Sequence, residues 1–258
     1  MLTPSRRRGE EHLDDPALDG AIAVRSLRDV ARSNALFGGR RAVLRALDAE
    51  LGALAARGTA TLLDVGTGVG DIPAHAVRLE ARRGVRLVTL RVELHPALAA
   101  AARPAVTHAL CADAFRLPLG DGTVDVVTCS QVLHHFEAPE ARRLLVELTR
   151  VARQCVIVGD LRRSWLAAGG FWLASWALGF HPVSRHDGVV SVLRGFTAPE
   201  LRLLVREAVG REATVQRRLG WRLAARWTPP PSAGAPAPPS RAPSSAPRPH
   251  AAPAAWPG

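Results

Sequence analysis

Residues 62–73 read LLDVGTGVGDIP, and this stretch decides the fold of the 258-residue chain. The apolar run Thr61–Val65 predicts a buried strand, and glycines at alternating positions follow it before a helix begins. Glycine has no Cβ, so such a loop turns tightly and lets the backbone approach a ligand. The loop departs from the GxGxxG dinucleotide fingerprint, because Asp71 stands where its last glycine would be. The carboxylate of Asp64, just before the loop, suits a cationic ligand better than a pyrophosphate.

Strand and helix patterns alternate on both sides of this loop. Further apolar runs predict strands at 85–92, 106–111, 124–129 and 155–159. Helical spacing predicts helices at 27–54 (broken at Gly38-Gly39), 72–83, 96–103, 139–153 and 197–209. The last begins with a capping box, Thr197 and Glu200, and a closing hairpin is expected from 215–219 and 221–227. Apolar strands between helices predict an α/β fold with a mainly parallel sheet, whose ligands bind at the carboxyl ends of the strands.

Acidic residues stand where the second and third strands are expected to end. Glu93 follows the second strand, where a carboxylate can accept hydrogen bonds from both hydroxyls of a ribose. Asp113 follows the third strand, where a carboxylate can accept a hydrogen bond from an adenine amino group. Taken alone, the glycines are also consistent with a plain turn, and each acidic residue with a solvated loop carboxylate. Together the residues favour a cofactor site.

In this order, the residues from about 61 to 160 resemble class I S-adenosylmethionine-dependent methyltransferases. The resemblance implies a Rossmann-like fold, with a seven-stranded, mostly parallel sheet and helices on both faces, and an enzyme that uses S-adenosylmethionine. LPLGDGTVDVVTCSQVLHHF (117–136) is similar to ubiquinone/menaquinone-type and other small-molecule methyltransferases of bacteria. SRHDGVVSVLRGFTAPELRLL (184–204) is similar to methyltransferases of polyketide or quinone-like pathways. Arg91 departs from the family pattern, in which small residues are common just before the acidic strand end.

The resemblance also implies which residues bind the cofactor: Asp64, Gly66, Thr67, Gly68, Gly70, Glu93, Leu94, Asp113, Ala114 and Ser130. By the family pattern, Asp64 and the glycine loop would hold the methionine portion and Glu93 the ribose. Asp113 and Ala114 would flank the adenine, and Ser130 would lie near the methionine portion or the methyl group.

Histidines are the candidates for the acceptor side of the reaction. An oxygen acceptor must lose a proton on methylation and a carbon acceptor must react as an enolate or electron-rich ring, so a base near neutral pKa helps. His134 and His135 follow the fourth strand, and His186 lies in the RHDG segment after the fifth strand. We expect His135 or His186 to be the base, with His134 as a further candidate. The alternative is that the histidine pair only packs or orients its loop.

An apolar segment and an N-terminal helix complete the expected acceptor site. Residues 165–180 (WLAAGGFWLASWALGF) are uncharged but too short for a membrane span. They form a buried cover helix, an apolar lid over a hydrophobic acceptor, or a patch in peripheral contact with a membrane. In related enzymes a helix before the first strand closes over the cofactor, so Asp29 and Asn34 are either ligand contacts or part of a surface helix.

The amino-acid composition limits the kinds of partner molecule that we expect. The net charge is +11, but all 34 basic residues are arginine and residues with AT-rich codons are scarce, which indicates a GC-rich bacterial genome rather than nucleic-acid binding. Cys111, Cys129 and Cys155 form no CxxC pair, so we expect buried free thiols in a reducing cytoplasm and no metal site. The first 16 residues lack the apolar region of a signal peptide.

The ends of the chain differ from its middle. Residues 229–258 are rich in proline and alanine without any hydrophobic period, so we expect a disordered tail. Residues 1–19 are expected to be a flexible N-terminus, and residues 20–228 the methyltransferase domain.

The leading interpretation is methyl transfer to an apolar small molecule such as a phenol, quinone or polyketide, on oxygen or carbon. The alternatives are a non-catalytic module that binds S-adenosylmethionine or a partner protein, a nucleic-acid methyltransferase and a nicotinamide oxidoreductase. The nucleic-acid alternative lacks an NPPY-type motif after the fourth strand, and the oxidoreductase is disfavoured by Asp71. The sequence leaves the acceptor and the oligomeric state open.

Overall fold

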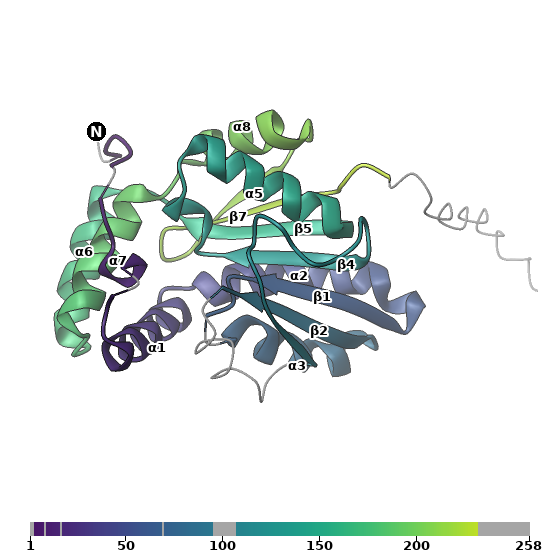
Figure 1. Cartoon of the computed structure of the whole chain (residues 1–258), viewed down its shortest axis with the longest axis horizontal. Helices are drawn as coiled ribbons and strands as arrows, with labels where there is room; N and C mark the ends of the chain where they lie inside the picture. Colours follow the sequence, from purple (N-terminus) through teal and green to yellow (C-terminus); the bar gives the residue numbers. More distant parts are fainter. Residues whose placement is uncertain (1–2, 8, 16, 69, 95–106, 232–258) are drawn as a thin grey trace, which may run out of the picture.

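A seven-stranded sheet in the order β3-β2-β1-β4-β5-β7-β6 forms the centre of the protein (Figure 1). The computed structural model describes residues 3–7, 9–15, 17–68, 70–94 and 107–231. The strands are β1 (Thr59–Val65), β2 (Arg86–Glu93), β3 (His108–Cys111), β4 (Val124–Ser130), β5 (Ala152–Leu161), β6 (Thr214–Arg218) and β7 (Arg222–Trp227). The first five pair in parallel, whereas β7 is antiparallel to both β5 and β6. The predicted fold class and the closing hairpin are confirmed.

Helices cover both faces of the sheet. The longer ones are α1 (Gly20–Leu36), α2 (Gly39–Leu54), α3 (Asp71–Arg83), α5 (Ala138–Val151), α6 (Trp165–Ala177), α7 (Pro182–Arg194) and α8 (Ala198–Val209). Three 3-10 turns add η1 (His12–Asp14), η2 (Ala55–Arg57) and η4 (Leu133–His135). Helices α2 and α3 pack on one face, and α5 and α8 pack on the other.

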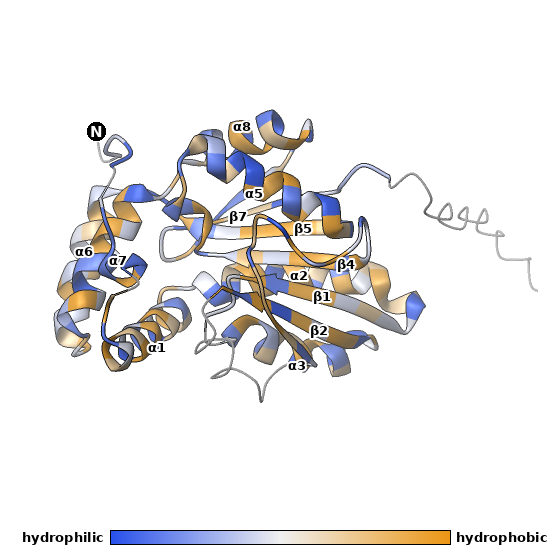
Figure 2. Cartoon of the chain, in the orientation of Figure 1, coloured by the Kyte–Doolittle hydropathy of each residue, from blue (hydrophilic) through white to orange (hydrophobic). Residues whose placement is uncertain are grey.

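Strand β1 shows why the apolar runs form the middle of the sheet. Leu62 is fully buried in the core beneath α2 and α3, and its neighbour Leu63 is fully buried in the core beneath α5 and α8. Successive side chains of a strand point to opposite faces, so a strand covered on both faces needs apolar residues at every position. Figure 2 accordingly shows the central strands mostly in orange.

A cap of helices stands beyond the carboxyl ends of the parallel strands. Helix α7 packs against α1, α6 and η1, and the group lies to one side of the sheet in Figure 1. Two buried carboxylates join its parts: Asp29 of α1 accepts hydrogen bonds from the His181 amide and the Ser184 hydroxyl, and Asp187 of α7 accepts from the amides of His12 and Leu13. None of the helices described here has the length and apolar character needed to cross a membrane.

Several elements differ from the sequence-based prediction. Helix α7 was not predicted, and the helix predicted at 139–153 ends at Val151 because Ala152 already pairs with Val124 in the sheet. Cys129 and Cys155 are buried as expected, but Cys111 is exposed. The helix predicted at 96–103 and most of the predicted tail lie outside the described residues.

The described part of the N-terminal segment makes specific contacts. Arg6 donates hydrogen bonds to the carbonyls of Arg194, His134 and Phe136, and Glu11 is buried. The domain boundaries drawn from the sequence stay predictions.

Candidate functional site

The glycine loop links β1 to α3 in a shape that depends on its first glycine. Gly66 has φ +68°, and a Cβ there would lie 2.4 Å from Cγ2 of Val132. Gly68 also has a positive φ of +54°, but a Cβ there would meet nothing within 4 Å. Gly70 is the N-cap of α3, with φ +76°. The loop is therefore tight at Gly66 and open at Gly68, where a ligand can approach the backbone.

Asp64 is a buried carboxylate at the end of β1. Its Oδ2 accepts a hydrogen bond from the Thr67 hydroxyl at 2.7 Å, and its Oδ1 accepts one from the Thr128 hydroxyl at 2.7 Å. Burial raises the pKa of Asp64 to about 7, against the lowering effect of the two hydroxyls, and the nearby charges of Asp71 and Glu93 raise it further. A buried carboxylate at the edge of the loop favours a positively charged ligand.

Glu93 ties the loop to the end of β2. Its Oε2 accepts a hydrogen bond from the Gly68 amide at 3.0 Å, and its Oε1 accepts one from the Leu94 amide at 3.0 Å. The Leu94 side chain is 68% exposed. These contacts fix the Glu93 carboxylate at the carboxyl edge of the sheet.

The remaining predicted cofactor residues lie along the same edge. Asp113, Ala114 and Ser130 border one cavity together with Asp64, Gly66, Thr67, Gly68, Glu93 and Leu94. The Asp113 Oδ1 accepts a hydrogen bond from the Phe115 amide at 2.9 Å, which holds this carboxylate at the end of β3. Gly70 does not border the cavity.

The cavity has a volume of about 950 Å³ and extends from these residues to the helical cap. Its far walls are mainly apolar and come from α1, α6, α7 and the residues after β4. They include Val24, Leu27, Val30, Phe37, Val132, Phe136, Leu166, Phe171, Phe180 and Val192. One chamber thus joins the predicted cofactor residues to an apolar space.

His134 borders this chamber after the end of β4. It is 2% exposed, its Nδ1 lies 2.7 Å from Oδ1 of Asp160, and its backbone amide donates to Oδ2 of the same carboxylate at 3.1 Å. Although burial acts to raise it, the pKa of Asp160 is lowered by His134 and by the Leu161 amide. The His134 Nε2 is buried and makes no hydrogen bond to any described residue.

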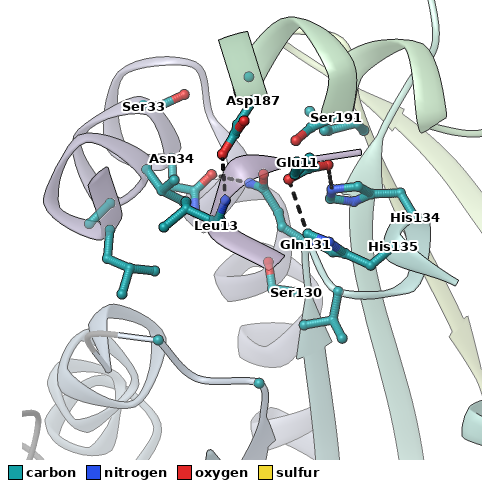
Figure 3. Close-up of a pocket in the computed structure, with 18 of the residues that line it drawn as sticks. Glu11, Leu13, Ser33, Asn34, Ser130, Gln131, His134, His135, Asp187 and Ser191 are labelled. Carbon is teal, nitrogen blue, oxygen red and sulfur yellow. Dashed lines mark hydrogen bonds and ion pairs between the residues drawn. The ribbon is translucent and has the colours of Figure 1, made fainter. Parts of the chain in front are cut away.

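His135 also borders the cavity and stacks on His134, with 4.4 Å between the ring centroids. Its Nδ1 lies 3.1 Å from Oδ1 of Asp14. Burial acts to lower the pKa of His135, but the hydrogen bond to Asp14 and the charge of Glu11 raise it overall. Figure 3 shows Glu11 facing both histidines, with its oxygens 3.8 Å from Nε2 of His134 and 3.9 Å from Nε2 of His135.

His186 is placed elsewhere. It is exposed on α7, does not border the cavity, and its Nδ1 lies 2.9 Å from Oδ1 of Asp187. The structure thus brings His134 and His135 to the predicted cofactor residues but not His186.

Two groups of residues in the described chain have the composition of metal ligands. Glu11, His134 and His135 offer ligand atoms within 4.8 Å of one another, and so do the exposed His12 and His186 with the buried Asp187. In the first group, Nη1 of Arg194 lies 3.3 Å from Oε1 of Glu11 and supplies a positive charge already. The absence of a metal stays a prediction.

Two further residues of the candidate site were not predicted from the sequence. Glu11 is buried from within a strongly polar N-terminal stretch, and no sequence signal indicates this. Gln131, directly after β4, has φ +58° and its side-chain amide donates to Asn34 of α1 (Figure 3). A positive φ in a non-glycine residue often marks a functional site. Asn34 and Asp29 both border the cavity, and their contact with a ligand stays a prediction.

Comparison with known protein families identifies part of the chain. Residues 63–157 match the profile of a family described as methyltransferase domain. The matched region runs from β1 into β5 and includes the glycine loop, Glu93 and the histidine pair. Methyltransferases of this family use S-adenosylmethionine, and the match supports an enzyme of this class with that cofactor. No curated protein matches the chain.

Solved structures share the fold of the domain and its flanking helices. An O-methyltransferase family protein from Burkholderia thailandensis has a TM-score of 0.50 and 16% identity, over 81% of this chain and 62% of that one. A SAM-dependent methyltransferase from Aquifex aeolicus has a TM-score of 0.49 and 17% identity, over 66% and 81%. Magnesium protoporphyrin IX methyltransferase from Synechocystis PCC 6803, solved with bound SAM, has a TM-score of 0.48 and 12% identity, over 85% and 88%. At such identities the likeness concerns the fold alone.

The residues at the sheet edge fit S-adenosylmethionine chemically. The cofactor carries a sulfonium and an ammonium group, and the buried Asp64 carboxylate offers a negative charge at the glycine loop. Gly68 leaves open space beside the loop, and Glu93 offers acceptor oxygens for hydroxyl groups. The site therefore combines a charge of the required sign with room for the ligand.

Proposed function

We propose that this protein transfers the methyl group of S-adenosylmethionine to an apolar small molecule, such as a phenol, a quinone or a polyketide-like compound. The observation that carries the proposal is the continuous cavity of about 950 Å³. One end holds the acidic and glycine positions expected for the cofactor, and the other end is lined mainly by apolar side chains of the cap. An apolar acceptor would gain free energy by leaving water for such a wall.

The bound cofactor supplies a methyl group on a sulfonium, which is already activated toward a nucleophile. The protein then has to orient the acceptor, exclude water and remove a proton. Helices α1, α6 and α7 form the cover that excludes water. We assign the proton transfer to His134, because its Nε2 is buried at the cavity and has no hydrogen-bond partner among the described residues.

Asp160 makes His134 suited to this role. With a proton on Nδ1 directed at the Asp160 carboxylate, Nε2 carries the lone pair that takes the acceptor proton. The resulting imidazolium would lie between the carboxylates of Asp160 and Glu11, which stabilise its charge. His135 is the weaker base candidate at neutral pH, because its raised pKa favours the protonated form.

The experiment is a methyl-transfer assay with labelled S-adenosylmethionine and a panel of phenols, quinones and their enolisable analogues. We expect His134→Asn to lower kcat about 10²–10⁴-fold while the affinity for S-adenosylhomocysteine stays within about twofold. His186→Asn is the matched control, because that histidine lies outside the cavity, and it should retain full activity. Equal kcat values for wild type and His134→Asn would overturn the assignment of the base.

The same assay separates the alternatives. A protein that binds the cofactor but methylates no member of the panel, while a partner protein binds to it, would favour a non-catalytic module. The ubiquinone/menaquinone-like subgroup, a bacterial source and a cytoplasmic location remain expectations from the sequence. Peripheral membrane contact through 165–180 is a further expectation from the sequence. Trp165, Trp172 and Trp176 of α6 are each between 44% and 57% exposed.

A further inference from the structure

A buried arginine at the start of β7 borders the cavity. Arg222 is the first residue of β7 and is 4% exposed. Burial lowers the pKa of Arg222 to about 10, so its guanidinium is still charged at neutral pH. Its Nε and Nη1 are buried and make no hydrogen bond to any described residue. A buried charge with two unpartnered donor atoms is costly, so its presence calls for a ligand or a structural role.

The nearest carboxylate does not satisfy these donors. Asp160 contributes a favourable charge interaction with Arg222, but its oxygens bond to other groups and not to Nε or Nη1 of Arg222. Oδ1 faces Nδ1 of His134 and accepts from the Leu161 amide at 2.6 Å, and Oδ2 accepts from the His134 amide. Asp160 therefore moderates the charge of Arg222 while the guanidinium hydrogens stay available.

A helix N-terminus lies beside the same guanidinium. A Cβ on Gly39, the first residue of α2, would lie 3.4 Å from Nε of Arg222 and 2.8 Å from the side-chain amides of Asn34 and Gln131. No side chain caps this helix, and its first turn contains no acidic residue. The first backbone N–H groups of a helix have no partner within it and favour an anion. Two independent features thus offer donors and positive charge at one place, next to Ser130 and Gln131 in the cavity wall.

We propose that Arg222 is the anion-binding residue of the cavity and that it holds an oxygen anion, a carboxylate or a phenolate, of a molecule bound there. A guanidinium presents a fork of N–H donors that matches two oxygens of one carboxylate. The anion has two possible sources, which are the carboxylate of the cofactor's methionine portion and an acidic group on the acceptor. The proposal rests on the proposed function in that both sources are molecules of the methyl-transfer reaction.

The test compares the full-length wild type with Arg222→Gln, Arg222→Lys and the control Arg162→Gln. Arg162 lies near Arg222 in the sheet, 6.0 Å from the Trp221 ring, but does not border the cavity. One arm measures calorimetric affinities for S-adenosylhomocysteine and for 5′-methylthioadenosine, which lacks the methionine carboxylate. The other arm measures binding of benzoate and its uncharged analogue benzamide, with and without S-adenosylhomocysteine.

If the anion belongs to the cofactor, Arg222→Gln weakens S-adenosylhomocysteine binding about 10–100-fold and leaves 5′-methylthioadenosine unchanged. If it belongs to the acceptor, Arg222→Gln removes a preference for benzoate over benzamide and leaves both nucleosides unchanged. Arg222→Lys keeps the charge but not the fork, so it should fall between wild type and Arg222→Gln. It also serves as the test variant if Arg222→Gln does not fold.

The proposal is overturned if the variants match wild type in both arms, even where their thermal stability changes. That result would leave Arg222 with the structural role of balancing Asp160. A failure of the proposed function looks different, because the wild type itself would then bind no S-adenosylhomocysteine and methylate nothing. The benzoate arm without nucleoside still tests Arg222 in that case.

Discussion

We expect cofactor binding to depend on pH through the carboxyl group of Asp64. Its pKa of about 7 in the free protein means that the carboxylate is mostly protonated at pH 6 and mostly ionised at pH 8. An ammonium or sulfonium ligand binds the ionised form, so the affinity for S-adenosylhomocysteine should rise with pH through this range. With one ionisation at about 7, the dissociation constant should fall about tenfold from pH 6 to pH 8, or about 1.4 kcal/mol.

Isothermal titration calorimetry at pH 6, 7 and 8, in buffers of different ionisation enthalpy, measures both the affinity and the proton released on binding. Asp64→Asn should bind more weakly at pH 8 and show no such slope. Its uncomplexed form should be more stable than wild type above pH 7, because a carboxyl with a raised pKa destabilises the folded state increasingly as pH rises from 3.8 toward 7. A flat wild-type affinity, or the same slope in Asp64→Asn, would refute the reasoning.

Four further substitutions test the glycine loop, the proposed ribose site and the N-terminal cap of α8. Gly66→Ala and Gly68→Ala each replace a left-handed glycine, which should cost about 1–2 kcal/mol, at about 2–4 °C of Tm per kcal/mol. Gly66→Ala should lower Tm further, because only its new Cβ would clash with Val132. Equal Tm shifts of the two variants in calorimetry would contradict this. Glu93→Gln should weaken S-adenosylhomocysteine binding about 10–100-fold with little change in Tm, and an unchanged dissociation constant would remove Glu93 from the site. Thr197→Ala should cost about 1 kcal/mol, or about 2–4 °C, and no shift would mean that the α8 cap is dispensable.

Much of the fold could be predicted because its signals are local. The run Thr61–Val65 is apolar at the positions that face either core, and the glycines that follow have the positive φ values that favour glycine. The capping box of Thr197 and Glu200 forms as expected. Each of these features depends on neighbours a few residues away, which the sequence shows directly.

The parts of the fold that could not be predicted depend on contacts between segments distant in the sequence. Helix α7 contains Gly188 and Asp187, which weaken its helical pattern, and it is fixed by packing against α6 and by hydrogen bonds to His12 and Leu13. Glu11 is buried because Arg194 pairs with it across the chain. Such ion pairs leave no periodic trace in either segment.

The residues of the proposed acceptor site could not be distinguished from the sequence for the same reason. The sequence placed three histidines after the right strands, but burial and hydrogen bonding distinguish them. His134 is held by Asp160 and faces the cavity, whereas His186 lies on the outer surface of α7. Arg222 gave no signal at all, since an arginine at the start of a strand is usually exposed.

The most direct test of the central claim is a thermal-shift titration of the full-length protein with S-adenosylhomocysteine, with NADH as the control ligand. At a ligand concentration 100 times the dissociation constant, binding adds about 2.7 kcal/mol of stability. At about 2–4 °C per kcal/mol, Tm should rise by about 5–10 °C. We predict this rise with S-adenosylhomocysteine only, and its loss in Glu93→Ala. No shift with millimolar S-adenosylhomocysteine, or an equal shift with NADH, would contradict the assignment of the cavity as a methyltransferase cofactor site.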